Sequence, residues 1–203
     1  MPYKTTIKKG NLITEEADFI VNASNTRLIL GSGVSMAFKR HCGFQLQTEL
    51  DAILGSMDGE LQQGDVVVSS SANATNFKYA LNVAVMNYNR GVRQTDKLPT
   101  LKTIEHSLQN IQKHLLLYAE KYSKPLKIAI PLMGCGVGGL DKVEVIKLYH
   151  NFFSQPIEIE CEVVIYGYSD EDYKLISSYF KADIKYSIHK DIFYITIKFT
   201  LKV

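Results

Sequence analysis

The stretch K-I-A-I-P-L-M-G-C-G-V-G-G-L-D, from Lys127 to Asp141, is the most informative part of the sequence. A short apolar strand ends at a proline and opens into a loop with four of the thirteen glycines, namely Gly134, Gly136, Gly138 and Gly139. Residues without a Cβ let backbone N–H groups approach an anion. No Gly-Lys-Ser/Thr follows, so the loop is not that of a nucleoside triphosphatase, and the dinucleotide fingerprint does not fit either. Phosphate contact by backbone alone and a tight turn without a ligand both stay open.

A second stretch has the same character. Residues 22–34 read N-A-S-N-T-R-L-I-L-G-S-G-V and lead from an apolar strand to the start of a helix. In open α/β sheets ligands bind outside the carboxyl ends of the strands, where helix N-termini favour anions. If the two stretches face each other, they would hold a diphosphate from both sides.

Apolar runs and amphipathic segments alternate along the chain. We expect strands at 18–22, 66–69, 79–86, 127–132 and 161–166, and helices at 34–40, 44–54, 101–118, 142–153 and 170–180. This alternation predicts a largely parallel sheet with helices on both faces. Helix 101–118 has a stripe of Leu101, Ile104, Leu108, Ile111, Leu115 and Tyr118, and the core candidates of helix 142–153 are Val143, Ile146, Leu148 and Phe152. The run 192–198 is rich in β-branched and aromatic residues and predicts an additional strand or hairpin.

Composition narrows the class of protein. The 203 residues include 46% apolar residues, which is typical of one globular domain. No apolar run reaches the roughly 18 residues that a bilayer span needs, and the N-terminus has no apolar signal core. We therefore expect a cytoplasmic protein without membrane contact. With 23 basic and 21 acidic residues, the chain lacks the basic character of a duplex-binding protein.

The cysteines give no metal or disulfide pattern. Cys42, Cys135 and Cys161 are far apart and odd in number, so we expect free thiols, no metal and no cofactor.

Four segments together resemble the macro domain family. The family pattern G-D-I-T corresponds to G-N-L-I-T at 10–14, and I-V-N-A-A-N corresponds to I-V-N-A-S-N at 20–25. G-S-G-V at 31–34 and the glycine loop match the two remaining segments, in the same order. The resemblance implies a three-layer α/β/α sandwich around a mixed, mostly parallel sheet over residues 1–182, with 183–203 as a β-rich extension of the same domain. It leaves the oligomeric state open.

The family also implies a cleft for ADP-ribose or an ADP-ribosylated macromolecule. By this resemblance Asn25 faces the distal ribose, Tyr168 stacks on adenine and the loop glycines contact the diphosphate. Asn11 stands where the family commonly has an aspartate that accepts the adenine amino group, so we expect weaker affinity or altered base preference. The implied ligand-binding residues are Asn11, Leu12, Ala23, Asn25, Gly31, Ser32, Gly33, Val34, Gly134, Cys135, Gly136, Val137, Gly138, Gly139 and Tyr168.

Some members of the family hydrolyse ADP-ribosyl linkages or process modified ADP-ribose, and others only bind. One hydrolase class has a carboxylate where this chain has Ser35, and another has a nucleophilic lysine where this chain has Met86 and Asn87. Asn25 and Asp141 are the remaining catalytic candidates, through a directly oriented water. Each has a structural alternative, because Asn25 can turn the chain after its strand and Asp141 can cap the helix that follows.

Overall fold

The computed structural model describes residues 3–122 and 124–180. The strands are β1 (Lys4–Lys9), β2 (Ala17–Asn25), β3 (Val66–Ser70), β4 (Phe77–Met86), β5 (Leu126–Pro131) and β6 (Cys161–Gly167). The helices are α1 (Gly33–Cys42), α2 (Phe44–Ser56), α3 (Leu101–Tyr122), α4 (Lys142–Phe153) and α5 (Asp170–Phe180), with short 3₁₀ turns η1 (Leu12–Thr14) and η2 (Gln94–Lys97). The predicted extension 183–203, with its candidate strand at 192–198, lies outside the described residues.

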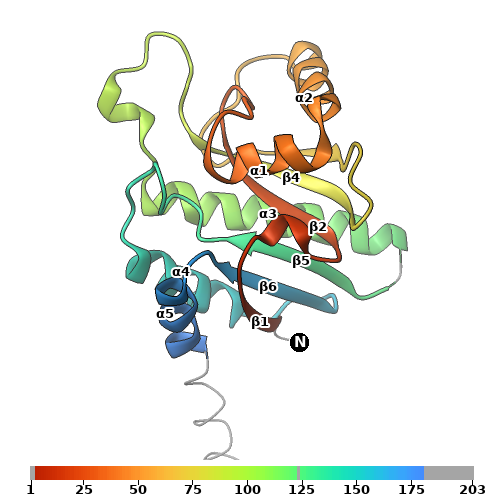
Figure 1. Cartoon of the computed structure of the whole chain (residues 1–203), viewed down its shortest axis with the longest axis vertical. Coiled ribbons are helices and arrows are strands. Elements are labelled where there is room, and N and C mark those ends of the chain that lie inside the picture. Colours follow the sequence, from red (N-terminus) through yellow and green to blue (C-terminus); the bar gives the residue numbers. More distant parts are fainter. Residues whose placement is uncertain (1–2, 123, 181–203) are drawn as a thin grey trace, which may run out of the picture.

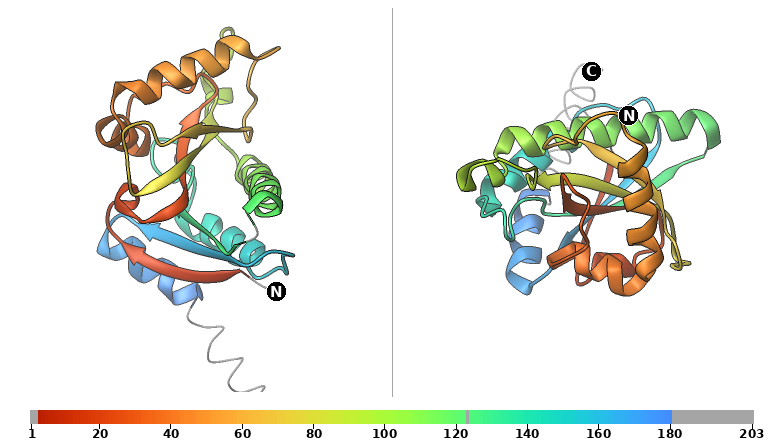
Figure 2. Two further views of the ribbon diagram at one scale, coloured as in Figure 1. Left: turned by 90° about the vertical axis from the view of Figure 1, so that its right-hand side faces the viewer. Right: turned by 90° about the horizontal axis from the view of Figure 1, so that it is seen from above.

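The strands form one mixed sheet in the order β1-β6-β5-β2-β4-β3. All neighbours run parallel except β3, which is antiparallel to β4. The sheet lies between two layers of helices (Figures 1 and 2), so the predicted three-layer fold class is confirmed. Strand β1 was not predicted, because its polar K-T-T-I-K-K sequence suits an edge strand and lacks a continuous apolar run.

Two hydrophobic clusters fill the spaces on either side of the sheet. On one face α1 and α2 bury Phe38, Cys42, Leu46 and Leu50. On the other face α3 buries the predicted Ile104, Leu108, Ile111 and Leu115, while Leu101 at the start of the helix is 39% exposed. Helix α5 packs against β1, β6 and α4. Among the described residues, none of the helices combines the length and apolar character that a bilayer crossing requires.

Helix α4 has the predicted bounds but not the predicted core face. Its buried residues are Val145, Ile146, Tyr149 and Phe153, so Ile146 was assigned correctly, and the predicted Leu148 and Phe152 are partly buried and pack against the same cluster. These positions follow the helical repeat on one stripe, whereas Val143, Leu148 and Phe152 flank it and are half-buried. The error arose because α4 also contacts α3 and α5, and its apolar surface is therefore wider than one stripe.

Strands β2 and β5 separate at their carboxyl ends. They pair only at Phe19 with Ile128 and at Ile20 with Ala129, although both strands continue beyond these residues. After β2 the chain passes to α1 on one face of the sheet, and after β5 it passes to α4 on the opposite face. Such a reversal creates a crevice outside the carboxyl ends of the strands, where open α/β sheets bind ligands.

Candidate functional site

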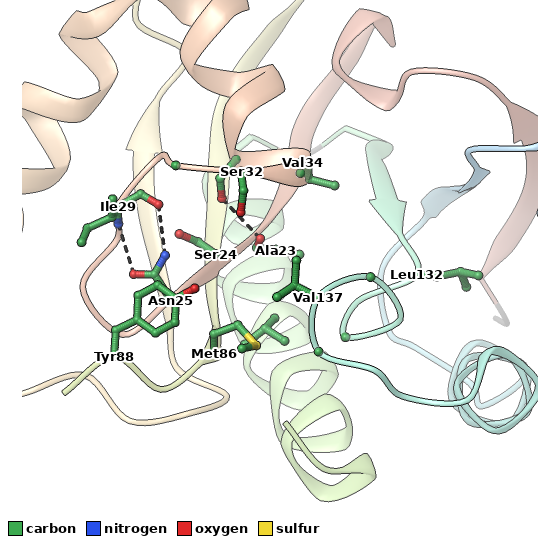
Figure 3. A pocket seen from close by; sticks show the side chains of 17 residues that line it. Ala23, Ser24, Asn25, Ile29, Ser32, Val34, Met86, Tyr88, Leu132 and Val137 are labelled. Atoms are coloured by element: carbon green, nitrogen blue, oxygen red, sulfur yellow. Dashed lines mark hydrogen bonds between the residues drawn. The ribbon is translucent and has the colours of Figure 1, made fainter. Parts of the chain in front are cut away.

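A cavity of about 210 Å³ occupies this crevice. It lies between the first loop, residues 26–32, and the second loop, residues 132–141 (Figure 3). The two loops come from distant parts of the sequence, and they face each other as the sequence analysis expected. The cavity is lined by Ala23, Ser24, Asn25, Ile29, Gly31, Ser32, Gly33, Val34, Ser35, Val85, Met86, Tyr88, Leu132, Gly134, Gly136, Val137 and Gly138.

Side-chain hydrogen bonds hold the first loop in shape. The Oδ1 atom of Asn25 accepts from the backbone N–H groups of Arg27 and Ile29, at 3.1 and 3.2 Å. Its Nδ2 atom donates to the Ile29 carbonyl at 3.0 Å. The turn places Leu28 at a φ of 50°, in the left-handed region that a leucine rarely occupies. Asn25 therefore closes the turn, which was the structural alternative considered for it.

Helix α2 supports the first loop from behind. Gln47 accepts from the Leu30 N–H through Oε1 at 2.9 Å, and its Nε2 atom donates to the Leu28 carbonyl at 3.2 Å. Gln47 does not line the cavity. It fixes the backbone of the loop against a rigid helix, and the position of the loop therefore depends on a residue outside the site.

The N-terminus of α1 lies at the cavity, since Ser32, Gly33 and Val34 line it. Ser32 is the N-cap residue but makes no side-chain capping bond, and Gly33 begins the helix at a φ of 53°. Gly31, Ser32 and Gly33 are exposed. The first N–H groups of a helix have no partner within the helix and carry partial positive charge, so this end is suited to an anion.

Glycines shape the second loop. Gly134 has a φ of 79°, and a Cβ there would lie 2.6 Å from Leu140 Cδ1. A Cβ on Gly138 would lie 2.6 Å from the Gly134 carbonyl oxygen. Backbone bonds from Gly139 N to Gly136 O and from Leu140 N to Gly134 O, at 3.1 and 3.0 Å, close the loop on itself. Only glycine permits this packing.

Tyr149 of α4 anchors the beginning of the second loop. Its buried hydroxyl donates to the Pro131 carbonyl at 2.7 Å and accepts from the Met133 N–H at 3.1 Å. Burial raises the pKa of the Tyr149 hydroxyl far above its usual value, so it stays protonated and keeps donating.

A chain of buried polar side chains runs under the cavity. Ser35 Oγ donates to Asn22 Oδ1 at 2.9 Å, and Asn22 Nδ2 donates to Asn82 Oδ1 at 3.0 Å. Asn82 Nδ2 in turn donates to Ser69 Oγ at 2.9 Å. The chain links α1 to β2, β4 and β3, so it joins the helix N-terminus to the sheet.

The wall of the cavity carries no acidic or basic side chain. Among the residues described in the structure, those that line it include no Asp, Glu, His, Lys, Arg or Cys. Val85, Met86 and Leu132 add apolar side chains to the lining, and Tyr88 adds an aromatic ring. An anion in the cavity therefore meets the dipoles of backbone N–H groups and of neutral polar side chains, and no charged side chain.

A family model described as Macro domain matches residues 21–149. The chain belongs to the macro domain family.

Known macro domains align with this chain over most of its length. A macro domain-containing protein of Caldanaerobacter subterraneus subsp. tengcongensis is 27% identical over 179 residues, which cover 87% of this chain and 95% of the relative. The Oceanobacillus iheyensis macrodomain solved with ADP has a TM-score of 0.72 at 20% identity, over 89% of this chain and 92% of that one. The Trypanosoma brucei macrodomain in complex with ADP-ribose has a TM-score of 0.65 at 19% identity, over 86% and 68%.

The structure brings most of the candidate residues of this macro domain together. Those that line the cavity are Ala23, Asn25, Gly31, Ser32, Gly33, Val34, Gly134, Gly136, Val137 and Gly138. Those that do not are Asn11, Leu12, Cys135, Gly139, Tyr168 and Asp141.

Asp141 has a structural role in the second loop, and Cys135 is a poor candidate for a nucleophile. Asp141 is exposed and caps α4, because its Oδ1 atom accepts from the Glu144 N–H at 3.0 Å. Cys135 is half-buried, and burial raises the pKa of its thiol to about 12. It is therefore a thiol at neutral pH and a poor nucleophile. All three cysteines are free thiols.

The residues predicted to hold adenine lie further along the same edge of the sheet. Asn11 caps η1 after β1, and Tyr168 follows β6 with 84% of its surface exposed. A bond from Gly10 N to Gly167 O, at 3.0 Å, joins the two segments. The Leu12 side chain is buried in the core, so only its backbone is available to a ligand.

Sequence reasoning missed seven residues that line the cavity, namely Ser24, Ile29, Ser35, Val85, Met86, Tyr88 and Leu132. Val85 and Met86 end β4, the strand next to β2, so the rule that ligands lie outside carboxyl ends could have found them. Tyr88 follows in a polar stretch with no signal of its own. It is placed by the bond from its N–H to Thr26 Oγ1 at 2.8 Å.

Proposed function

We propose that this macro domain binds ADP-ribose, free or attached to a macromolecule, with the diphosphate between the two loops. The observation that carries the proposal is the cavity at the point where β2 and β5 separate, because both glycine-containing loops wall it. Macrodomains of the same fold have been solved with ADP and with ADP-ribose, which supports the choice of ligand.

Charge and geometry support a diphosphate in particular. The ligand is an anion, and the donors that face it are main-chain N–H groups of the α1 N-terminus and of the second loop. Gly31, Gly33, Gly136 and Gly138 line the cavity without side chains, so an oxygen atom can come close to the backbone. No carboxylate among the lining residues repels it.

The order of the strands supports the orientation of the ligand. Along the carboxyl edge, β1 and β6 carry Asn11 and Tyr168, and β5 and β2 carry the two loops. A nucleotide laid across this edge places its base at the β1–β6 end and its terminal ribose beside Asn25. Tyr168 is exposed and therefore accessible for stacking on a base.

Recognition is the better supported activity, and hydrolysis the less supported. No Asp, Glu, His, Lys or Cys lies among the described lining residues, so the lining hydroxyls have no partner there to activate them as nucleophiles. The side chains of the two catalytic candidates make structural hydrogen bonds, since Asn25 closes the first loop and Asp141 caps α4. We also propose a cytoplasmic location, because the three free thiols fit a reducing compartment.

Isothermal titration calorimetry with ADP-ribose tests the proposal. We expect saturable binding at one site, weaker binding of ADP and weaker still of AMP, because each lacks groups that the loops contact. Absence of binding to all three ligands contradicts the proposal.

A second assay separates recognition from hydrolysis. The protein is incubated with mono-ADP-ribosylated protein and with ADP-ribosylated DNA, and release of ADP-ribose is followed by mass spectrometry. We expect none above the spontaneous rate. Release by the wild type that disappears in Asn25→Ala or Asp141→Ala establishes an enzyme instead.

A further inference from the structure

The hydroxyl of Ser24 is a buried polar group without a partner at the wall of the cavity. Ser24 belongs to β2, lines the cavity and is 4% exposed. Its Oγ atom has no hydrogen-bond partner among the described residues. Buried hydroxyls almost always have one, because an unpaired polar group destabilises the folded state. A ligand in the cavity would supply the missing partner.

The polar side chains next to Ser24 in the sequence or on the neighbouring helix make hydrogen bonds to other parts of the protein. Ser35, on the neighbouring helix, donates its one proton toward Asn22 and the Ala23 carbonyl. Both acceptor positions of Asn25 and one of its amide protons are used by the first loop. The second amide proton of Asn25 and the acceptor lone pairs of Ser35 Oγ remain, but neither is within hydrogen-bonding geometry of the Ser24 hydroxyl in the ligand-free structure.

The position of Ser24 indicates which part of the ligand it meets. Figure 3 shows Ser24 between the turn closed by Asn25 and Ile29 and the α1 N-terminus at Ser32. Backbone N–H groups of that N-terminus serve the phosphates, and they are donors only. A hydroxyl both donates and accepts, which matches another hydroxyl better than a proton-free phosphate oxygen. Oγ itself is buried in the ligand-free structure, so contact with a ligand requires the side chain to rotate to another staggered rotamer.

We propose that Ser24 is a specificity-determining residue that hydrogen-bonds a hydroxyl of the terminal ribose of bound ADP-ribose. This inference rests on the proposed function. Ser24 would then let the protein distinguish ADP-ribose from ADP. The family pattern I-V-N-A-A-N has an alanine at this position, so the hydroxyl is a feature of this chain.

The test compares Ser24→Ala with the wild type in two measurements. In calorimetry, Ser24→Ala binds ADP-ribose about three- to tenfold more weakly and binds ADP unchanged, because ADP has no terminal ribose. In thermal unfolding without ligand, Ser24→Ala melts ~2–4 °C higher, because the variant removes an unpaired buried hydroxyl.

Ser177→Ala is the matched control. Ser177 in α5 is the other buried hydroxyl without a partner among the described residues, and it does not line the cavity. Its variant loses the same atom and melts higher, but it binds both nucleotides like the wild type.

Three results would overturn the inference. They are unchanged ADP-ribose binding by Ser24→Ala, an equal loss for ADP and ADP-ribose, and a lower melting temperature of the ligand-free variant. A wild type that binds neither nucleotide would overturn the proposed function as well. If the wild type binds ADP-ribose and Ser24→Ala binds it equally tightly, only the role of Ser24 is refuted.

Discussion

The two loops around the cavity reach complementary shapes by opposite means. Side chains brace the first loop, with Asn25 closing its turn and Gln47 holding its backbone from α2. The second loop relies on the absence of side chains, because Gly134 and Gly138 leave no space for a Cβ. A site of this kind is sensitive to lost polar groups on one side and to added carbon atoms on the other.

The largest effect is expected for Gly138→Ala in the second loop. The added Cβ would lie 2.6 Å from the Gly134 carbonyl oxygen and 2.7 Å from Pro99 Cγ, so the backbone has to shift. We expect a loss of ~1–3 kcal/mol in the free energy of unfolding and at least about tenfold weaker ADP-ribose binding. Chemical denaturation and calorimetry measure the two quantities.

Gly136→Ala is the control for this prediction. A Cβ at Gly136 has no atom within 4 Å in the free protein, so its free energy of unfolding should stay within ~0.5 kcal/mol of the wild type. Equal stability of the Gly138 and Gly136 variants would show that packing does not shape the second loop.

The next largest effect is expected for Asn25 in the first loop. Asn25→Ala removes three hydrogen bonds and should cost about 2 kcal/mol of stability, with at least about tenfold weaker ligand binding. Asn25→Asp keeps both acceptor bonds and should lose only about 1 kcal/mol. Its negative charge should nevertheless weaken binding of the diphosphate more than alanine does.

The order of these two variants separates the roles of the residue. If Asn25→Asp binds ADP-ribose like the wild type, the cavity does not hold the anionic part of the ligand. If Asn25→Ala is as stable as the wild type, its side chain does not hold the turn.

A smaller effect is expected for Gln47, which touches the first loop but not the cavity. Gln47→Ala should lower the free energy of unfolding by about 1 kcal/mol and weaken ADP-ribose binding about threefold, because Leu30 N–H and the Leu28 carbonyl lose their partner. Thr48→Ala, which changes an exposed neighbour on the same helix, should do neither. Identical binding by the two variants would mean that the first loop keeps its shape unaided.

Asn11 belongs to neither loop and should affect only the base end of the ligand. Asn11→Asp keeps a good N-cap for η1 and introduces a charged acceptor for the adenine amino group. We expect ADP-ribose to bind as tightly as to the wild type or up to a few times tighter, by calorimetry. Clearly weaker binding would refute the proposed orientation of the nucleotide.

The smallest effect concerns pH, since neither loop places an acidic or basic side chain at the cavity. The dissociation constant for ADP-ribose should change less than about twofold between about pH 6 and 8. A steep change would reveal a titrating group that contacts the ligand.

The free energy of unfolding, in contrast, should decrease at acidic pH, because of Glu15. Burial opposes ionisation of this carboxyl, but hydrogen bonds from Lys127, Lys8 and Tyr166 outweigh it and lower its pKa from 4.5 to about 2. The stabilisation is therefore complete above about pH 4.5 and is lost as the pH falls toward about 2. Glu15→Gln should be less stable at neutral pH and should show a shallower acid transition in denaturant titrations.

The sequence predicted those features that depend on local pattern. Alternating apolar runs predicted the strands and the layers, and the paired glycine loops predicted where a cavity would form. The polar edge strand β1 was missed because its pairing with β6 depends on tertiary contacts. For a different reason the sequence could not choose between the two roles of Asn25 and Asp141. That choice depends on backbone geometry several residues away, which places the Ile29 and Glu144 N–H groups within reach.

The pair Asn22 and Asn82 has one more consequence. The two residues are direct neighbours across β2 and β4 and are completely buried. Sliding one strand along the other by two residues would keep every side chain on its own face but would strand both amides in an apolar interior, at roughly 1–3 kcal/mol each. The paired asparagines thus specify the register of β2 and β4. The relative position of the carboxyl ends of β2 and β4, which carry part of the cavity lining, is therefore determined within the sheet.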